Sequence, residues 1–273
     1  QGAPIINRKK VIKIRDLHMK SKYYLNKNLT NSKLIEKIIN NIDLRFIDNL
    51  MNREENTLYR FLHTFIPKKY REKININILE EGALNHYGKL RDIDKMATVA
   101  TFYIINSICK NIKRGSYLNI GVWKGFSLFS GMLGTECEVV GVDNFAEFNG
   151  INAKNDFNKN FNKIKKDNHF FYNTDALVFL KKCTKKFDFY FYDALHTYDY
   201  QYQALELADK NLNKNALILI DDISWNYSDE PLRATRDFLK NHQNKYQLLF
   251  DVRTKYNRHP SFWNGYFLIE KIS

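Results

Sequence analysis

The feature that most constrains the fold is a stretch in which two apolar runs flank a helical segment. The first run, residues 187–193, ends in one acid, and the second, residues 216–222, ends in two. Short runs rich in aromatic and branched aliphatic residues predict buried strands. Between the runs, residues 200–211 have the apolar spacing of a helix. The stretch therefore predicts a strand, a helix and a second strand.

A strand–helix–strand unit normally has parallel strands, because the crossover returns the chain to the same end of the sheet. Parallel neighbours finish at the same edge. We therefore expect Asp193, at the end of the first strand, to lie near Asp221 and Asp222, at the end of the second. The carboxyl ends of the strands are also where open α/β sheets bind their ligands.

From residue 116 onward the pattern alternates between strands and helices, which predicts an α/β fold with a doubly wound, mostly parallel sheet of seven strands. The short link at residues 253–264 suits an antiparallel return between the last two strands better than a crossover helix. The expected strands are 116–121, 138–143, 169–173, 187–193, 216–222, 246–252 and 265–271, and the expected helices are 126–133, 155–161, 176–182, 200–211 and 230–242.

The first part of the chain has a different character. We interpret residues 1–30 as a basic arm with a short strand at 11–14, residues 31–66 as helical and residues 67–92 as loop-rich, and we expect an apolar helix at 92–111. The apolar stripes of the helical stretch are typical of a core or of the contact face of a homo-oligomer.

The positive charge is concentrated in the same part. Residues 1–116 hold 23 Lys and Arg against 11 Asp and Glu, whereas residues 117–273 hold 20 against 19. Such an excess suits nucleic acid, a membrane surface or a phosphorylated substrate, and it also suits a merely solvated basic surface. Because no RNA-binding signature accompanies it, nucleic acid is not the expected partner.

Several features bear on the compartment. No apolar run reaches membrane-spanning length, and no signal peptide is visible. Three scattered cysteines without metal-ligand spacing favour a reducing compartment over a disulfide framework. The expected location is the cytoplasm.

A glycine-containing loop joins the first strand to the first helix and runs from Asn119 to Ser127. Gly121 permits a tight turn close to a ligand, and Gly125 allows the helix to start close to the strand with free N–H groups. The GxxxG spacing differs from the GxGxxG of dinucleotide-binding folds. The two glycines could also serve only as turn formers.

Acids also end the second and third strands. Asp143 ends the second strand, where an acid can accept hydrogen bonds from both hydroxyls of a ribose. Asp175 follows the third strand, where it or a nearby backbone N–H could contact an adenine amine or ring nitrogen. Either residue could instead cap the helix that follows it.

The acids of the central stretch predict a cation site. Carboxylates that converge on one edge repel one another unless a cation lies among them, and oxygen ligands favour Mg²⁺ or Ca²⁺ over zinc. The alternative is that Asp221 or Asp222 caps the following turn. His196 follows Asp193 by three residues. An unperturbed pKa of about 6.5 suits an imidazole for proton removal at neutral pH, although a lone histidine is often structural.

With these motifs, the sequence resembles the class I S-adenosylmethionine-dependent methyltransferases. Gly121-Val122-Trp123-Lys124-Gly125 resembles the first motif of the macrocin-type sugar O-methyltransferases, and its extension to Ser127 resembles catechol O-methyltransferase. The resemblance implies a Rossmann-like sheet of seven strands with an antiparallel last strand. It also implies cofactor contacts for Gly121, Gly125 and Ser127 at the methionine end, Asp143 at the ribose and Asp175 at the adenine side.

The same resemblance implies that Asp193, Asp221 and Asp222 are ligands of Mg²⁺ or another divalent cation, with His196 as the general base. One departure is Asn119, which stands where these families usually have an acid. An amide can still accept a hydrogen bond from the amino group of the cofactor, but it lacks the charge.

The resemblance covers residues 90–273 and divides the chain into a basic, mainly helical extension, residues 1–90, and a methyltransferase domain, residues 91–273. The implied activity is methylation of a hydroxyl on a small acceptor, with a sugar or nucleotide-linked sugar as the leading class. An RNA-binding or RNA-modifying methyltransferase that uses the basic part, and a non-catalytic scaffold, are the alternatives. The last loop mixes cations with aromatics and could line an acceptor site, or it could be only an exposed polar turn. Its candidate residues are Arg253, Lys255, Arg258, His259 and Trp263.

Overall fold

The computed structural model describes residues 23–44, 76–78, 80, 82–148, 150–225, 227–254, 257–258 and 261–273. Residues 1–22 of the expected basic arm, with its strand at 11–14, lie outside these residues, as do residues 45–66 of the stretch expected to be helical.

The main sheet has eight strands in the order β1-β9-β10-β8-β7-β4-β5-β6. The pairs β8–β7, β7–β4, β4–β5 and β5–β6 are parallel, whereas β10 is antiparallel to both β8 and β9. All seven expected strands and the antiparallel return are therefore confirmed. Their bounds are β4 (Ser116–Ile120), β5 (Glu138–Asp143), β6 (His169–Asn173), β7 (Phe187–Tyr192), β8 (Leu212–Ile220), β9 (Tyr246–Val252) and β10 (Tyr266–Lys271).

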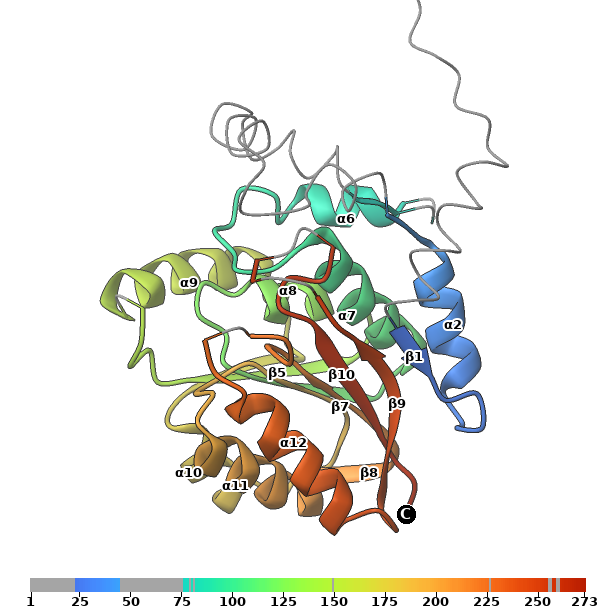
Figure 1. Cartoon of the computed structure of the whole chain (residues 1–273). Helices are drawn as coiled ribbons and strands as arrows, with labels where there is room; N and C mark the ends of the chain where they lie inside the picture. The colour runs from blue at the N-terminus through green and yellow to red at the C-terminus, as the bar shows by residue number, and fades with distance from the viewer. Residues whose placement is uncertain are drawn as a thin grey trace, which may run out of the picture.

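Helices cover both faces of the sheet (Figure 1). One face carries α7 (Val99–Asn111), α8 (Phe126–Met132) and α9 (Gly150–Ile164), and the other carries α10 (Ala176–Lys182), α11 (Tyr198–Ala208) and α12 (Glu230–Asn241). A short 3-10 turn, η1 (Asp209–Asn211), follows α11.

The last four residues of strand β7, Phe189–Tyr192, are all aromatic, and their burial explains why. Alternate side chains of a strand point to opposite faces, and both faces of this sheet are covered. Phe189 and Phe191 belong to the core cluster under α7 and α8, whereas Tyr190 and Tyr192 belong to the cluster on the other face. Each of the four side chains is at most 1% exposed. A strand buried on both faces has no place for polar alternation.

The N-terminal region contributes the eighth strand, β1 (Tyr23–Leu25), which pairs antiparallel with β9. It is followed by α2 (Ser32–Asn40), and further small elements are β2 (Ile42–Leu44), β3 (Ile76–Ile78) and α6 (Ala83–Gly88). Ile35, Ile38 and Ile39 of α2 are each 2% exposed and belong to the core cluster on the α7 side. This part of the apolar stripe therefore packs within the chain.

Several predicted boundaries were wrong. The helix expected at residues 155–161 extends over Gly150–Ile164, and the stretch expected to be loop-rich, 67–92, contains β3 and α6. The helix expected at residues 92–111 begins at Val99, because Thr98 has extended backbone angles and forms a capping box with Thr101. The stretch expected to be helical from residue 31 ends its helix at Asn40, and residues 42–44 form β2, paired with β3. Short-range apolar spacing did not reveal either boundary.

The strand order creates a switch point. β4 lies between β5 and β7 in the sheet. The chain runs from β4 to β5 and β6 on one side of β4, and then crosses to form β7 and β8 on the other side. Crevices at the carboxyl ends of strands at such a point are the ligand sites of open α/β sheets. The tips of β4 and β7 are therefore the place at which to look for a site.

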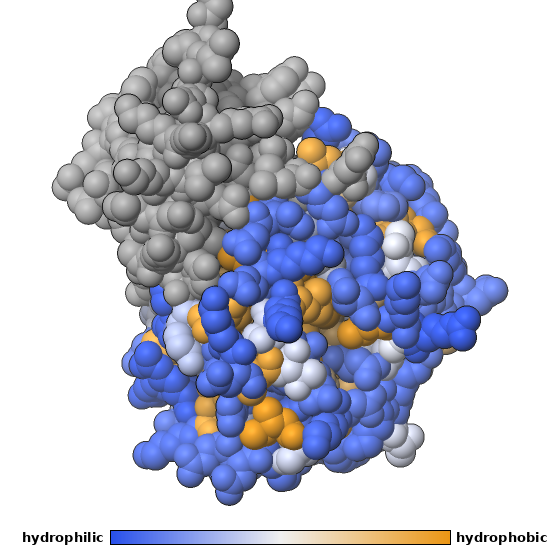
Figure 2. Space-filling view, turned by 90° about the vertical axis from the view of Figure 1, so that its right-hand side faces the viewer, coloured by the Kyte–Doolittle hydropathy of each residue, from blue (hydrophilic) through white to orange (hydrophobic). Residues whose placement is uncertain are grey.

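The face of the molecule in Figure 2 is mainly hydrophilic and carries small apolar patches. Within the part of the chain that the structure describes, every helix is too short or too polar to span a membrane.

We predict that His169 in β6 makes stability depend on pH. It is 5% exposed, its Nδ1 accepts a hydrogen bond from the Lys166 backbone N–H at 3.0 Å, and burial, with the Lys166 charge, lowers its pKa to about 4. An unfolded histidine takes up a proton near pH ~6.5. Because the unfolded state binds the proton first, the free energy of unfolding should fall between about pH 6.5 and 4, by up to roughly 3 kcal/mol.

Urea denaturation at a series of pH values, with the wild-type protein and His169→Gln, measures this contribution. The difference between the two free energies of unfolding should change across that window. A constant difference from pH 7 to pH 4 would contradict the prediction.

Candidate functional site

A cavity of about 750 Å³ lies where the strands of the switch point end. Most of the residues singled out in the sequence line it, although they come from loops after five different strands. They are Gly121, Ser127, Asp143, Asp175, Asp193, His196, Asp221 and Asp222. Of the ten residues predicted to bind the cofactor or metal or to act as base, Asn119 and Gly125 do not line it. The sheet thus gathers the predicted ligand-binding and acidic residues around one space.

The turn after β4 requires glycine at residue 121. Its φ is +82°, and a Cβ there would lie 1.8 Å from the backbone oxygen of Asp193. The N–H of Asp193 in turn donates to the oxygen of Ile120 at 2.9 Å. The tips of β4 and β7 therefore approach more closely than any side chain at 121 would allow. Gly125 has a φ of +98° and lies against the ring of Phe129.

Asn119 bonds to both ends of the loop that follows β4. It is fully buried, its Oδ1 accepts a hydrogen bond from the Ser127 hydroxyl at 2.8 Å, and its Nδ2 donates to the oxygen of Gly121 at 3.1 Å. The amide thus joins both ends of the loop. An aspartate could not donate to Gly121, which gives a physical reason for the amide at this position. Its contact with a cofactor amino group stays a prediction.

Asp143 shapes the same loop from β5. Its Oδ2 accepts hydrogen bonds from the N–H groups of Val122 and Trp123, both at 2.8 Å, and its Oδ1 accepts one from Phe145 at 2.6 Å. The carboxylate therefore fixes the glycine turn while lining the cavity. Oδ2 thus accepts two bonds and Oδ1 one, which leaves one lone pair, on Oδ1, for a further donor. The contact with ribose hydroxyls stays a prediction.

Asp175 caps α10, as the alternative interpretation of the sequence anticipated. Its Oδ1 accepts a hydrogen bond from the N–H of Val178 at 3.0 Å, and its Oδ2 accepts one from the hydroxyl of Tyr200 at 2.6 Å. Tyr200 lines the same cavity. A role beside adenine stays a prediction.

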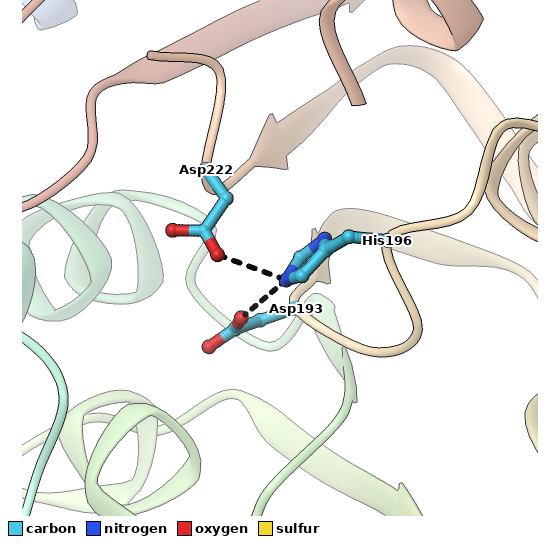
Figure 3. A group of neighbouring side chains, drawn as sticks. All are labelled: Asp193, His196 and Asp222. Atoms are coloured by element: carbon cyan, nitrogen blue, oxygen red, sulfur yellow. Dashed lines mark ion pairs between the residues drawn. The ribbon is translucent and has the colours of Figure 1, made fainter. Parts of the chain in front are cut away.

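The acidic centre consists of Asp193, His196 and Asp222 (Figure 3). The Nε2 of His196 lies 3.5 Å from Oδ1 of Asp193 and 3.1 Å from Oδ2 of Asp222, so one ring nitrogen faces both carboxylates. Within the described ranges, these three residues form the group of potential metal ligands, with ligand atoms within 4.8 Å of one another. The two carboxylates offer oxygen ligands that fit a divalent cation, and the imidazole nitrogen lies beside them.

The charges of this centre are strongly coupled. Burial by itself would lower the pKa of His196, but hydrogen bonds to Asp193 and Asp222, together with their negative charges, outweigh burial and raise the pKa to about 10. The ring is thus an imidazolium at neutral pH and stands where a cation would balance the two carboxylates. It can accept a proton near neutral pH only where another positive charge has taken over that balance.

Asp221 is the third predicted ligand, and it lies outside this three-residue group. Its side chain is buried, with the residue 2% exposed, and its Oδ1 accepts the N–H of Asp222 at 2.7 Å. Burial, followed by the charges of Asp193 and Asp222, raises the pKa of its carboxyl well above the usual range. Ligation of a cation by Asp221 stays a prediction.

Three aromatic residues of the cavity, Phe148, Trp225 and Tyr227, were not assigned to the site from the sequence. Trp225 lies with its ring centroid 6.0 Å from that of His196, and Tyr227 packs edge-on against Trp225. Tyr227 is 82% exposed and Phe148, in the loop after β5, is 63% exposed. Only their position in the sequence could have indicated them, because each follows a strand that ends in an acid by a few residues.

The loop between β9 and β10 contributes two of its five candidates to the cavity, Arg258 and Trp263. Arg253 instead pairs with Asp251 and lies over the ring of Phe267. Lys255 and His259 lie outside the described residues.

Comparisons with known proteins agree with this fold. Residues 118–223 match the family model described as a methyltransferase domain. No curated protein matches the chain in sequence. Among solved structures, the SAH-bound methyltransferase PaMTH1 of Podospora anserina is similar with a TM-score of 0.54 and 17% identity, over 82% of this chain and 98% of that one.

Two further similar structures are O-methyltransferases. TomG of Streptomyces achromogenes, involved in tomaymycin synthesis and in complex with SAM, gives a TM-score of 0.51 and 14% identity, over 76% of this chain and 96% of that one. An O-methyltransferase from Bacillus cereus in complex with SAH gives 0.50 and 15%, over 83% and 96%. The chain therefore has the Rossmann-like fold of class I methyltransferases.

The close approach at Gly121 leads to a prediction about substitution. Gly121→Ala should lower the free energy of unfolding more than Gly82→Ala, since both positions have nearly the same φ but a Cβ at 82 meets nothing within 4 Å. The control should lose about 1–2 kcal/mol for its left-handed backbone. Gly121→Ala should lose roughly 1–3 kcal/mol more, because the β4 and β7 tips must separate. Equal losses in urea denaturation would contradict the steric argument.

Proposed function

We propose that this protein is an S-adenosylmethionine-dependent O-methyltransferase that methylates a hydroxyl group of a small molecule with the help of a divalent cation. One observation carries the proposal. The glycine turn with Asp143 and the acidic centre with His196 line the same cavity, so a methyl donor and a cation-bound acceptor would meet within it.

The donor would lie along the tips of β4, β5 and β6. Gly121 and Ser127 line the part of the cavity where its methionine end would lie, and Oδ1 of Asp143 can accept a hydrogen bond from its ribose. Asp175 and Tyr200 would flank its adenine. S-adenosylmethionine supplies an electrophilic methyl group on a positively charged sulfur. The residues of the turn position that group, since the transfer depends on near-attack geometry between donor and acceptor.

The acceptor would lie beside the acidic centre. Asp193 and Asp222 would hold a cation such as Mg²⁺, with the neighbouring Asp221 as a third ligand. The cation supplies Lewis acidity, which lowers the pKa of an acceptor hydroxyl. Because the ion would balance the charges of Asp193 and Asp222, these carboxylates would no longer stabilise the protonated form of His196. The neutral ring can then take the proton of the acceptor hydroxyl at Nε2.

A sugar or nucleotide-linked sugar is the acceptor class we favour, through the resemblance to macrocin-type enzymes. Vicinal hydroxyls suit a chelated cation, and the aromatic rings of Trp225 and Tyr227 offer surfaces for a ring. The guanidinium of Arg258, which also lines the cavity, suits a phosphate.

We also propose a cytoplasmic location for the protein. The three cysteines are free, which accords with the reducing cytoplasm. A homo-oligomer formed through the N-terminal region stays a prediction, to be checked by light scattering.

A first test concerns cation and base. A panel of sugars and nucleotide sugars should yield a methylated product with Mg²⁺ and none with EDTA. His196→Ala should lower kcat about 10²–10⁴-fold, the usual contribution of a positioned acid or base, without loss of cofactor binding. His242→Ala is the matched control, because His242 pairs with Glu206 on the surface and does not line the cavity. Undiminished turnover by His196→Ala would remove the proposed base.

A second test concerns the cofactor alone. Calorimetry should detect binding of S-adenosylmethionine even with EDTA, because the glycine turn does not include the carboxylates of the acidic centre. Asp143→Asn should weaken binding at least about tenfold, the effect of roughly 1.4 kcal/mol. Asp188→Asn serves as control, since Asp188 also accepts a backbone N–H, that of Ser116 at 2.9 Å, but at the opposite edge of the sheet.

If neither S-adenosylmethionine nor SAH binds, the fold serves another purpose in this protein. A scaffold role would then be the better account. Binding of RNA by a protein that methylates no small acceptor would favour the nucleic-acid alternative.

A further inference from the structure

We propose that Asn264 is a positioning residue that orients Asp222 for cation binding, an inference that rests on the function proposed above. Asn264 is 5% exposed and precedes β10. Its Nδ2 donates a hydrogen bond to Oδ1 of Asp222 at 2.7 Å. A buried amide that contacts a carboxylate at the cavity wall restricts how that carboxylate can turn.

The contact follows from the reversed last strand. Because β10 is antiparallel to β8, with Phe267 opposite Ile220, the residues before β10 lie beside those after β8. The pairing continues beyond the strands, since the N–H of Ser224 donates to the oxygen of Asn264 at 2.6 Å. A parallel last strand would place its preceding loop at the other edge of the sheet. The antiparallel return is thus what brings an amide to the acidic centre.

The amide divides the two oxygens of Asp222 between separate tasks. Oδ1 is held by Asn264, and Oδ2 faces Nε2 of His196 at 3.1 Å. Asp222 also has a φ of +61°, in the left-handed region that aspartate adopts as a single residue. A carboxylate with one oxygen fixed presents the other oxygen in a defined direction, as a metal ligand requires.

The other end of the amide faces the acceptor side. Oδ1 of Asn264 accepts the backbone N–H of Arg258 at 2.6 Å, and both Arg258 and Trp263 line the cavity. Asn264 therefore connects the wall of the acceptor region to the acidic centre. This explains why a polar side chain is buried here, since both ends of the amide have partners.

The test measures cation affinity of the full chain without cofactor or acceptor. Binding of Mn²⁺, followed by the electron paramagnetic resonance of the free ion, should give a Kd about 10–100 times higher for Asn264→Leu than for the wild type, the usual effect of losing a residue that supports a metal ligand. Asn264→Gln keeps an amide but displaces its donor, so its Kd should lie between the two.

Asn211→Leu is the matched control. Asn211 is 1% exposed, and its Nδ2 donates to the oxygens of Cys183 and Lys185 at 2.8 and 2.9 Å, at the opposite edge of the sheet. Losing these bonds should lower the free energy of unfolding, as Asn264→Leu also should, but leave the Kd for Mn²⁺ unchanged. The comparison separates an effect on the ligand from a general loss of stability.

Wild-type affinity in Asn264→Leu would overturn the inference. If that variant does not fold, wild-type affinity in Asn264→Gln would overturn it instead. Equal weakening by Asn211→Leu would show that stability alone governs binding, and would also overturn it. If the wild-type protein binds no Mn²⁺, both this inference and the metal part of the proposed function fail, whereas calorimetry with S-adenosylmethionine still tests the rest.

Discussion

Two carboxylates that share one edge of a buried sheet need a positive charge, and the site is arranged around that need. Asp193 comes from β7 and Asp222 from β8, and the parallel pairing of these strands brings their ends together. In the structure the imidazolium of His196 provides the compensating charge. A bound cation would replace it and return the imidazole to its neutral form. In the proposed function, the same pair of acids would therefore hold either a proton on His196 or a metal ion.

The sequence predicted the sheet well because its strands carry strong local signals. β7 and β8 are apolar runs that end in acids, and Gly121 marks the turn at the switch point. The element boundaries of the N-terminal part were harder to predict. The helix at residues 32–40 stops because the chain turns into β2, and α7 starts late because Thr98 caps it. Such ends depend on contacts with distant residues, which local apolar spacing does not contain.

The location of the site could be predicted from the sequence, but the hydrogen bonds within it could not. Parallel pairing predicted that acids would gather, and eight of the candidate residues do line one cavity. The hydrogen bonds of Asp143 to the loop after β4, and of Asn264 to Asp222, join residues from different strands. The spacing of residues along the sequence does not indicate these pairs. It likewise gave no sign that His196 would be held as a cation, since its pKa depends on two carboxylates that only folding brings to one nitrogen.

The short β1 strand has a consequence for how the protein behaves in solution. It pairs with β9, which would otherwise be the outermost strand of the sheet on that side. An outer strand with free backbone groups is a template for edge-to-edge association, and native proteins commonly cover it. Residues 23–25 act as such a cover. A shortened chain without them would expose the N–H and C=O groups of β9 and become prone to aggregation, even with its cavity intact.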